Sequence, residues 1–79
     1  IMNPLKRKYS FTSFEEAIAF IDRVSPIFSR ENHHPQITNF YNTVEFAYYT
    51  TSANNSVTEV DHKIANEVEA IYQTQTRQF

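Results

Sequence analysis

The chain has 79 residues, enough for one small domain over residues 1–79, and its net charge is −2. This charge balance provides no basic surface for nucleic acid, and the absence of cysteine excludes disulfides, thiolate zinc sites and cysteine nucleophiles. No apolar run approaches the ~18 residues of a membrane span, and no signal peptide is visible. We therefore expect a soluble cytoplasmic domain that binds neither nucleic acid nor membranes.

A strand and a long helix are predicted for the first part of the chain. From Leu5 to Phe11 the residues alternate between two faces, with Leu5, Arg7, Tyr9 and Phe11 on one face, which is the period of a half-buried strand. Ser13 then has the features of a helix N-cap, with Glu16 placed to reach back to it. Apolar residues at helical spacing continue to about Arg30, so the helix is predicted to end there.

Pro26 lies inside this helical pattern. A proline has no backbone N–H, so it removes the hydrogen bond to the carbonyl of Asp22. We expect a kink or an early stop of the helix at this point.

Two adjacent histidines, His33 and His34, follow the helix and precede Pro35. Proline restricts the residue before it to extended backbone, so the pair lies at a defined junction. Imidazole changes its charge between pH 5 and 8, which suits proton transfer without a metal. A metal site is the weaker interpretation, because adjacent side chains diverge and only His62 remains as a further histidine. The structural alternative is that one ring packs on an aromatic and the other is solvated.

Two strands and a second helix are predicted after the histidines. The strands are Ile37 to Tyr41 and Thr43 to Thr51, with a turn at Asn42. The last helix begins near Thr58, where Asp61 stands at the third position of a capping-type start. In the second strand, three residues are predicted to share one face: Val44, Phe46 and Tyr48.

The sequence contains no glycine. Left-handed backbone positions must then fall to asparagine or aspartate. The pair Asn54-Asn55 is the obvious candidate turn.

The order strand, helix, two strands, helix (β-α-β-β-α) predicts an α+β domain. We expect a small antiparallel sheet of about three strands with both helices packed on one face. So small a sheet has exposed edges, and an exposed edge is a template for pairing. A homodimer or homotetramer is therefore expected.

The order of elements and several residues resemble the pterin-4a-carbinolamine dehydratase family over nearly the whole chain. The core of the resemblance is the His-His-Pro element at residues 33–35. The other matching positions are Tyr9-Ser10-Phe11, Phe14, Ala17, Phe20, Arg23, Val24, Asn39, Tyr41-Asn42, Val44, Asp61 and Ala65.

The resemblance implies a hydro-lyase that dehydrates 4a-hydroxytetrahydropterin to quinonoid dihydropterin in tetrahydrobiopterin recycling. The pterin is the substrate, and no metal or other cofactor is implied. His33 and His34 would form the acid–base pair, and Pro35 would fix their geometry. The departing hydroxyl needs a proton and a ring N–H must lose one, which suits imidazoles.

The sequence departs from the family pattern at two positions. Ser29 stands where the family usually carries an acidic residue, and Glu31 is two positions away from that place. Thr51 stands where the family has a third histidine or a tryptophan; threonine forms hydrogen bonds but does not exchange a proton near neutrality. Asp61 is either a helix-start acid or a residue that holds the pterin edge. The predicted substrate-binding residues are Pro35, Thr51, Asp61, Ser29 and Glu31.

A second interpretation belongs to a different class of protein. The two departures, Ser29 and Thr51, suggest an impaired dehydratase that keeps the fold as a scaffold. The resemblance allows this, because relatives in the family act as dimerisation cofactors of a transcription factor or as assembly factors. Such a scaffold would bind a protein partner through its sheet edge or a helix face.

Overall fold

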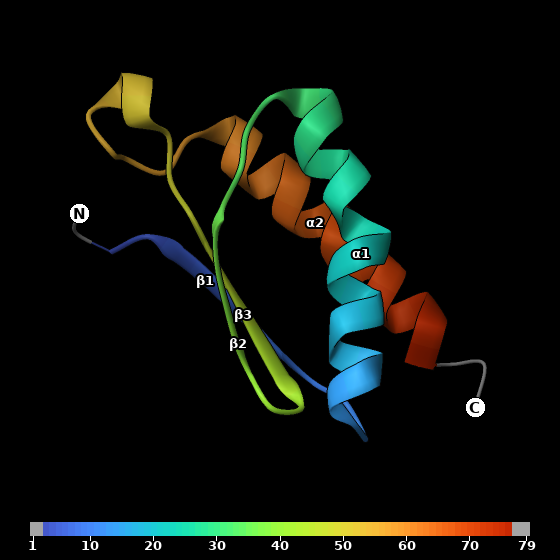
Figure 1. Ribbon diagram of the computed structural model, residues 1–79. Coiled ribbons are helices and arrows are strands. Elements are labelled where there is room, and N and C mark those ends of the chain that lie inside the picture. The colour runs from blue at the N-terminus through green and yellow to red at the C-terminus, as the bar shows by residue number, and fades with distance from the viewer. Residues whose placement is uncertain (1–2, 77–79) are drawn as a thin grey trace.

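The computed structural model describes residues 3–76 and contains three strands and two long helices. The elements are β1 (Leu5–Ser10), α1 (Phe14–Glu31), β2 (Gln36–Phe40), β3 (Thr43–Tyr48), a 3-10 turn (Thr51–Ala53) and α2 (Glu59–Thr76). The strands form one antiparallel sheet in the order β1-β3-β2, and both helices lie on the same side of it (Figure 1). The predicted α+β fold is confirmed. Neither of the two helices in this part of the chain is long and apolar enough to cross a bilayer.

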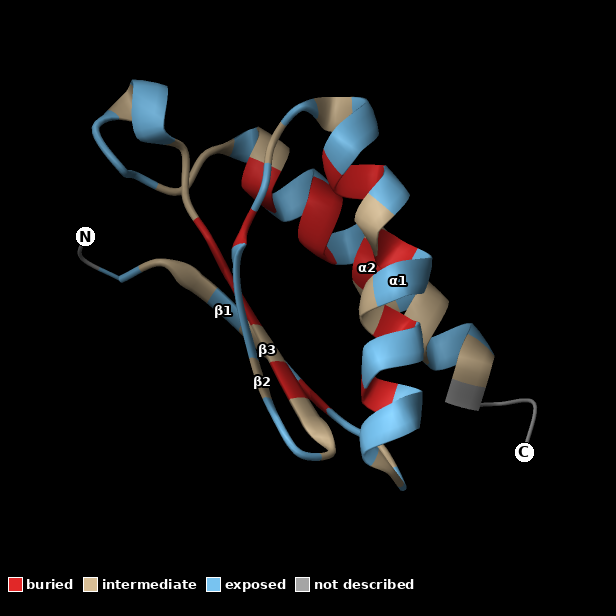
Figure 2. Ribbon diagram, in the orientation of Figure 1, coloured by how far each residue is buried: buried red, intermediate tan, exposed pale blue. Residues whose placement is uncertain are grey.

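The core lies between the sheet and the helices (Figure 2). In β3, every second residue is fully buried, as the alternation predicted: Val44, Phe46 and Tyr48. The helices contribute Ala17, Phe20, Val24, Ile27 and Phe28 from α1 and Ile64, Ala65 and Val68 from α2. The end of α1 lies beside the start of α2, where Glu31 pairs with Lys63 at 3.1 Å.

β3 is shorter than predicted. It ends at Tyr48 rather than at Thr51. The sheet register gives the reason: Tyr48 pairs with Leu5, the first residue of β1, so the ladder has no further partner in that strand. Beyond this point Thr50 bonds across a loop instead, with its N–H donating to the carbonyl of Ser56 at 2.8 Å.

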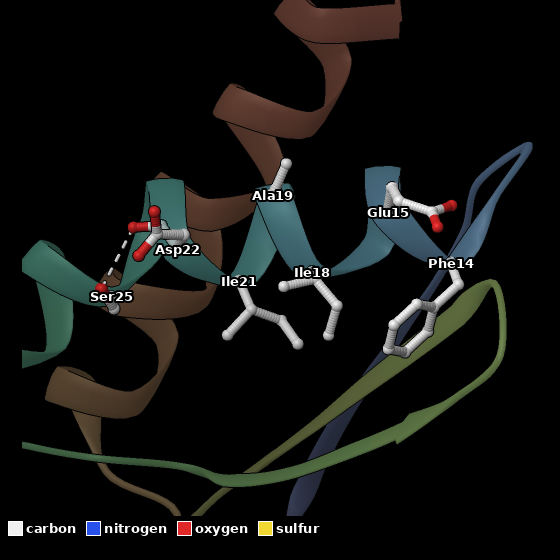
Figure 3. Close-up of a pocket in the computed structure, with 7 residues that line it drawn as sticks. All are labelled: Phe14, Glu15, Ile18, Ala19, Ile21, Asp22 and Ser25. Carbon is white, nitrogen blue, oxygen red and sulfur yellow. Dashed lines mark hydrogen bonds between the residues drawn. The ribbon is translucent and has the colours of Figure 1, made fainter.

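Of the two outcomes expected at Pro26, the early stop of the helix does not occur. α1 continues through Pro26 to Glu31. The hydroxyl of Ser25 donates to the carbonyl of Asp22 at 3.1 Å, as Figure 3 shows. The carbonyl that the proline deprives of its usual donor therefore keeps a hydrogen bond, supplied by a side chain.

The start of α1 is capped almost as predicted. Ser13 Oγ accepts a hydrogen bond from the backbone N–H of Glu16 at 3.1 Å. The Glu16 carboxylate does not return to Ser13, however; it accepts from both the N–H and the hydroxyl of Thr12, at 3.1 and 2.6 Å. These two hydrogen bonds hold the pKa of Glu16 below its ordinary value.

Asparagines occupy most of the left-handed positions, as the lack of glycine requires. Asn54 and Asn55 have φ of 60° and 63°, which confirms that predicted turn. The β2–β3 hairpin turns at Tyr41 and Asn42, as predicted, and its left-handed residue is Tyr41, with φ of 52°. Asn42 instead exchanges two hydrogen bonds with Phe11, at 2.8 and 2.9 Å, and these hold the strained hairpin tip in place.

Candidate acid–base site

The two histidines lie in the turn that ends α1. Asn32 adopts the left-handed conformation, and its N–H donates to the carbonyl of Ser29 at 3.1 Å. The N–H of His33 then donates to the carbonyl of Phe28 at 3.0 Å. This pattern closes the helix end and directs the following chain. As a result His33 is mostly covered, whereas His34 is exposed.

His33 contacts a buried carboxylate from the other helix. Its Nε2 lies 2.6 Å from Oδ1 of Asp61, in the first turn of α2. The side chain of His33 is 16% exposed and that of Asp61 is fully buried. So short a contact between an imidazole and a carboxylate is a charge-assisted hydrogen bond. The fold thus joins two predicted site residues that stand 28 positions apart.

The second oxygen of Asp61 accepts hydrogen bonds from two threonines. The hydroxyl of Thr50 lies 2.7 Å from Oδ2, and the backbone N–H of Thr58 donates to the same atom at 2.9 Å. The two threonine hydroxyls are also 2.7 Å apart. The carboxylate is therefore held on both oxygens by groups from three separate segments of the chain.

The pKa of Asp61 reflects a competition between burial and hydrogen bonding. Burial alone raises this pKa, because it disfavours the charged form. The hydrogen bonds from Thr50, from the backbone of Thr58 and from His33 act in the opposite direction and prevail, so the pKa of Asp61 lies below its ordinary value. Asp61 is therefore ionised at neutral pH.

Glu31 is held in a surface ion-pair cluster between the helices. Its carboxylate lies 3.1 Å from both the Lys63 ammonium and the Arg30 guanidinium. Arg30 also binds Glu67 of α2, at 2.7 Å. Hydrogen bonds from Lys63 and Arg30 hold the pKa of Glu31 below its ordinary value. In this arrangement Glu31 links α1 to α2.

The other predicted site residues are not joined to this network. Ser29, His34 and Thr51 are exposed, as is His62 on α2, and Pro35 is buried. Their side chains make no hydrogen bond within residues 3–76. The described part of the chain also holds no cluster of three histidine and acidic residues that could bind a metal ion.

Thr50 is the residue that the sequence analysis did not identify. Its neighbour Thr51, which the sequence predicts as a substrate-binding residue, begins the 3-10 turn and is exposed. The contact of Thr58 with Asp61 was implied by the capping-type start of α2. The sequence offers no comparable local signal for Thr50, because its bond to Asp61 spans 11 positions and depends on the loop between them.

A carboxylate that is hydrogen-bonded to an imidazole orients the ring and stabilises its protonated form, so the imidazole can accept or donate a proton. The chemistry of this arrangement, at a helix end in a small α+β domain, suits acid–base work.

Comparison with known proteins identifies the family. Residues 2–71 match the family model described as pterin 4 alpha carbinolamine dehydratase. A provisionally named pterin-4-alpha-carbinolamine dehydratase from Chelativorans sp. is 37% identical over 68 residues, covering 86% of this chain and 68% of the relative. Another from Prochlorococcus marinus is 34% identical over 73 residues, covering 92% of this chain and 75% of the relative. The chain belongs to the pterin-4-alpha-carbinolamine dehydratase family.

A solved structure agrees with this assignment. The crystal structure of a transcriptional coactivator/pterin dehydratase from Brucella melitensis superimposes with a TM-score of 0.80 at 31% sequence identity. The match covers 91% of this chain and 78% of the other. The fold of the family is therefore preserved here.

Proposed function

We propose that the protein is a 4a-hydroxytetrahydrobiopterin dehydratase, a hydro-lyase that removes water from 4a-hydroxytetrahydropterin in tetrahydrobiopterin recycling. The observation that carries the proposal is the 2.6 Å contact of His33 with buried Asp61, beside the exposed His34. Membership of the dehydratase family supplies the substrate class.

The reaction adds a proton to the pterin at one place and removes a proton at another. The 4a-hydroxyl leaves as water once an acid has protonated it, and a ring N–H of the pterin gives its proton to a base. His33 and His34 supply these two groups, and buried Pro35 holds the junction between them and β2. No net proton is gained or lost by the protein over one turnover.

The remaining substrate contacts are part of the same proposal. Thr51 and Ser29 have exposed side chains, so hydrogen bonds to a pterin would replace water. Asp61 is fully buried and acts through His33. Glu31 has a side chain 19% exposed and already pairs with Lys63, so its contact with a substrate would be made at the edge of the site.

The test is turnover of the 4a-carbinolamine by the purified protein, compared with the spontaneous rate. Substitution of His33 or His34 by Ala should lower the catalysed rate by about 10²–10⁴-fold, the usual contribution of a positioned acid or base. His62→Ala is the matched control. His62 is exposed, like His34, and lies in the first turn of α2, so its substitution should leave the rate unchanged. A wild-type rate equal to the spontaneous one at saturating substrate would refute the proposal.

A second candidate function, that of a scaffold, is favoured by an apolar groove on α1. Phe14 and Ile18 are 44% and 42% exposed, and with Ile21 they line a groove of about 520 Å³. Their side chains point to the same side of the helix (Figure 3). The Brucella relative is named a transcriptional coactivator as well as a dehydratase.

We propose that this groove binds a second copy of the chain, giving a homodimer or homotetramer that presents a surface to a protein partner. Light scattering at several concentrations tests the assembly, and a monomer throughout would refute it.

A further inference from the structure

We infer that Asp61, held by the backbone N–H of Thr58, fixes the tautomer of His33, placing its proton on Nε2 and leaving Nδ1 as the atom that accepts a proton. The catalytic use of Nδ1 rests on the proposed function. The assignment of the tautomer is independent of the proposed function, because it follows from the hydrogen-bond donors and acceptors around Asp61.

The count begins at the backbone N–H of Thr58. This group can only donate, and it points at Oδ2 of Asp61 at 2.9 Å. Oδ2 accepts this hydrogen bond, which favours the ionised carboxylate and helps to lower the pKa of Asp61. The hydroxyl of Thr50 lies 2.7 Å from the same atom and completes its hydrogen bonding.

The threonine hydroxyls have a defined direction. Each carries a single proton. Thr50 donates its proton to Asp61, so the 2.7 Å contact between the hydroxyls requires Thr58 to donate to Thr50. The direct distance from the Thr58 hydroxyl to Oδ2 is longer, at 3.4 Å, which agrees with this direction. The chain of donation runs from Thr58 to Thr50 to Asp61.

The other carboxylate oxygen of Asp61, Oδ1, then determines which nitrogen of His33 carries the proton. Asp61 is buried and ionised, so Oδ1 can only accept. Nε2 of His33, 2.6 Å away, must carry the hydrogen. In neutral imidazole the other nitrogen has the lone pair, and within residues 3–76 Nδ1 forms no hydrogen bond. When Nδ1 takes a proton, the carboxylate stabilises the imidazolium that forms. Asp61 is thus a positioning residue for His33.

Substitution of Asp61 by Asn should change the tautomer of His33, which would not be expected if Asp61 had only a structural role. The N–H of Thr58 still needs an oxygen opposite it, so the amide of Asn would place its oxygen there and its NH₂ toward His33. An NH₂ group only donates. Nε2 of His33 would then have to accept, and the proton of the neutral ring would move to Nδ1.

The experiment is long-range ¹H–¹⁵N NMR of the imidazole nitrogens, recorded after each ring has lost its second proton on raising the pH. In the wild-type protein His33 should carry its proton on Nε2, and in Asp61→Asn on Nδ1. His34 is exposed and serves as an internal control, because its spectrum should be the same in both proteins. Amide spectra check that the variant is folded.

A second variant protects the test if Asp61→Asn does not fold. Thr50→Val removes the hydroxyl but keeps the N–H of Thr58 on Oδ2, so the Nε2–H form should persist. A proton on Nδ1 of His33 in the wild-type protein would overturn the inference, as would an unchanged tautomer in a folded Asp61→Asn protein. The measurement uses no substrate, so an inactive protein with the Nε2–H form would refute the proposed function and support the tautomer.

Discussion

At the scale of single residues, two buried tyrosines differ in one hydrogen bond. The hydroxyl of Tyr9 donates to Glu69 at 3.1 Å, whereas the buried hydroxyl of Tyr48 has no partner within residues 3–76. Burial raises the pKa of both phenols. A buried polar group without a partner costs about 1–3 kcal/mol, and a typical satisfied hydrogen bond contributes only ~1 kcal/mol.

We therefore expect Tyr48→Phe to leave the free energy of unfolding unchanged or to raise it by about 1 kcal/mol. Tyr9→Phe, its matched control, should lower the same quantity by about 1 kcal/mol because it removes a hydrogen bond. Urea unfolding curves of the two variants provide the measurement. A clear loss of stability in Tyr48→Phe, equal to that in Tyr9→Phe, would show that the Tyr48 hydroxyl is satisfied.

Asp61 should make stability dependent on pH in the acid range. Its pKa is lower in the folded protein than in the unfolded chain, whose carboxyls titrate near pH ~3.9. The folded state thus binds fewer protons, so the stabilisation is present above that pH and is lost as the pH falls through the folded pKa. Urea midpoints measured between about pH 2 and pH 6 should fall on acidification, and less steeply in Asp61→Asn. Equal slopes in the two proteins would contradict the assignment.

At the scale of elements, α1 shows how a local defect is repaired. Pro26 removes one backbone donor from the helix, and the hydroxyl of Ser25 bonds to the Asp22 carbonyl at 3.1 Å. A proline in a helix interior usually costs about 3 kcal/mol, so this side-chain bond recovers only part of the loss.

Pro26→Ala should accordingly raise the free energy of unfolding, by about 1–3 kcal/mol, because it restores the backbone hydrogen bond. Ser25→Ala should lower it by about 0.5–1.5 kcal/mol in the natural chain. The same Ser25 substitution should have a smaller effect in the Pro26→Ala background. Additive effects in this double-mutant cycle would mean that the Ser25 hydroxyl does not replace the missing donor.

At the scale of the whole molecule, the apolar surface left on α1 makes a prediction about assembly. Ile18 is 42% exposed and lies in the groove with Phe14. Ile18→Asp should shift the proposed oligomer to monomer in light scattering, because a charge would be buried at the contact. Thr38→Asp, an exposed control on β2, should leave the assembly intact. Dissociation by both variants would place the contact elsewhere.

Much of the fold was determined by local sequence patterns. Alternation predicted which face of β3 is buried, Ser13 predicted the start of α1, and Asn54-Asn55 predicted a left-handed turn. These features depend on neighbours a few positions apart, so the sequence alone is sufficient to find them. The wrong end of β3 arose where a distant partner decides the outcome: β3 stops where β1 begins, which no residue near Tyr48 indicates.

The candidate site likewise has some features that local sequence determines and others that depend on tertiary contacts. The sequence by itself determined that two imidazoles stand at a helix end before a proline, and that Asp61 opens the last helix. Only the tertiary structure decided that His33 is the ring that meets Asp61, that Thr50 helps to hold the carboxylate, and that His34 stays exposed. The physical reason is that hydrogen bonds across 28 and 11 positions depend on how α1, α2 and the intervening loop pack. No pattern of adjacent residues carries that information.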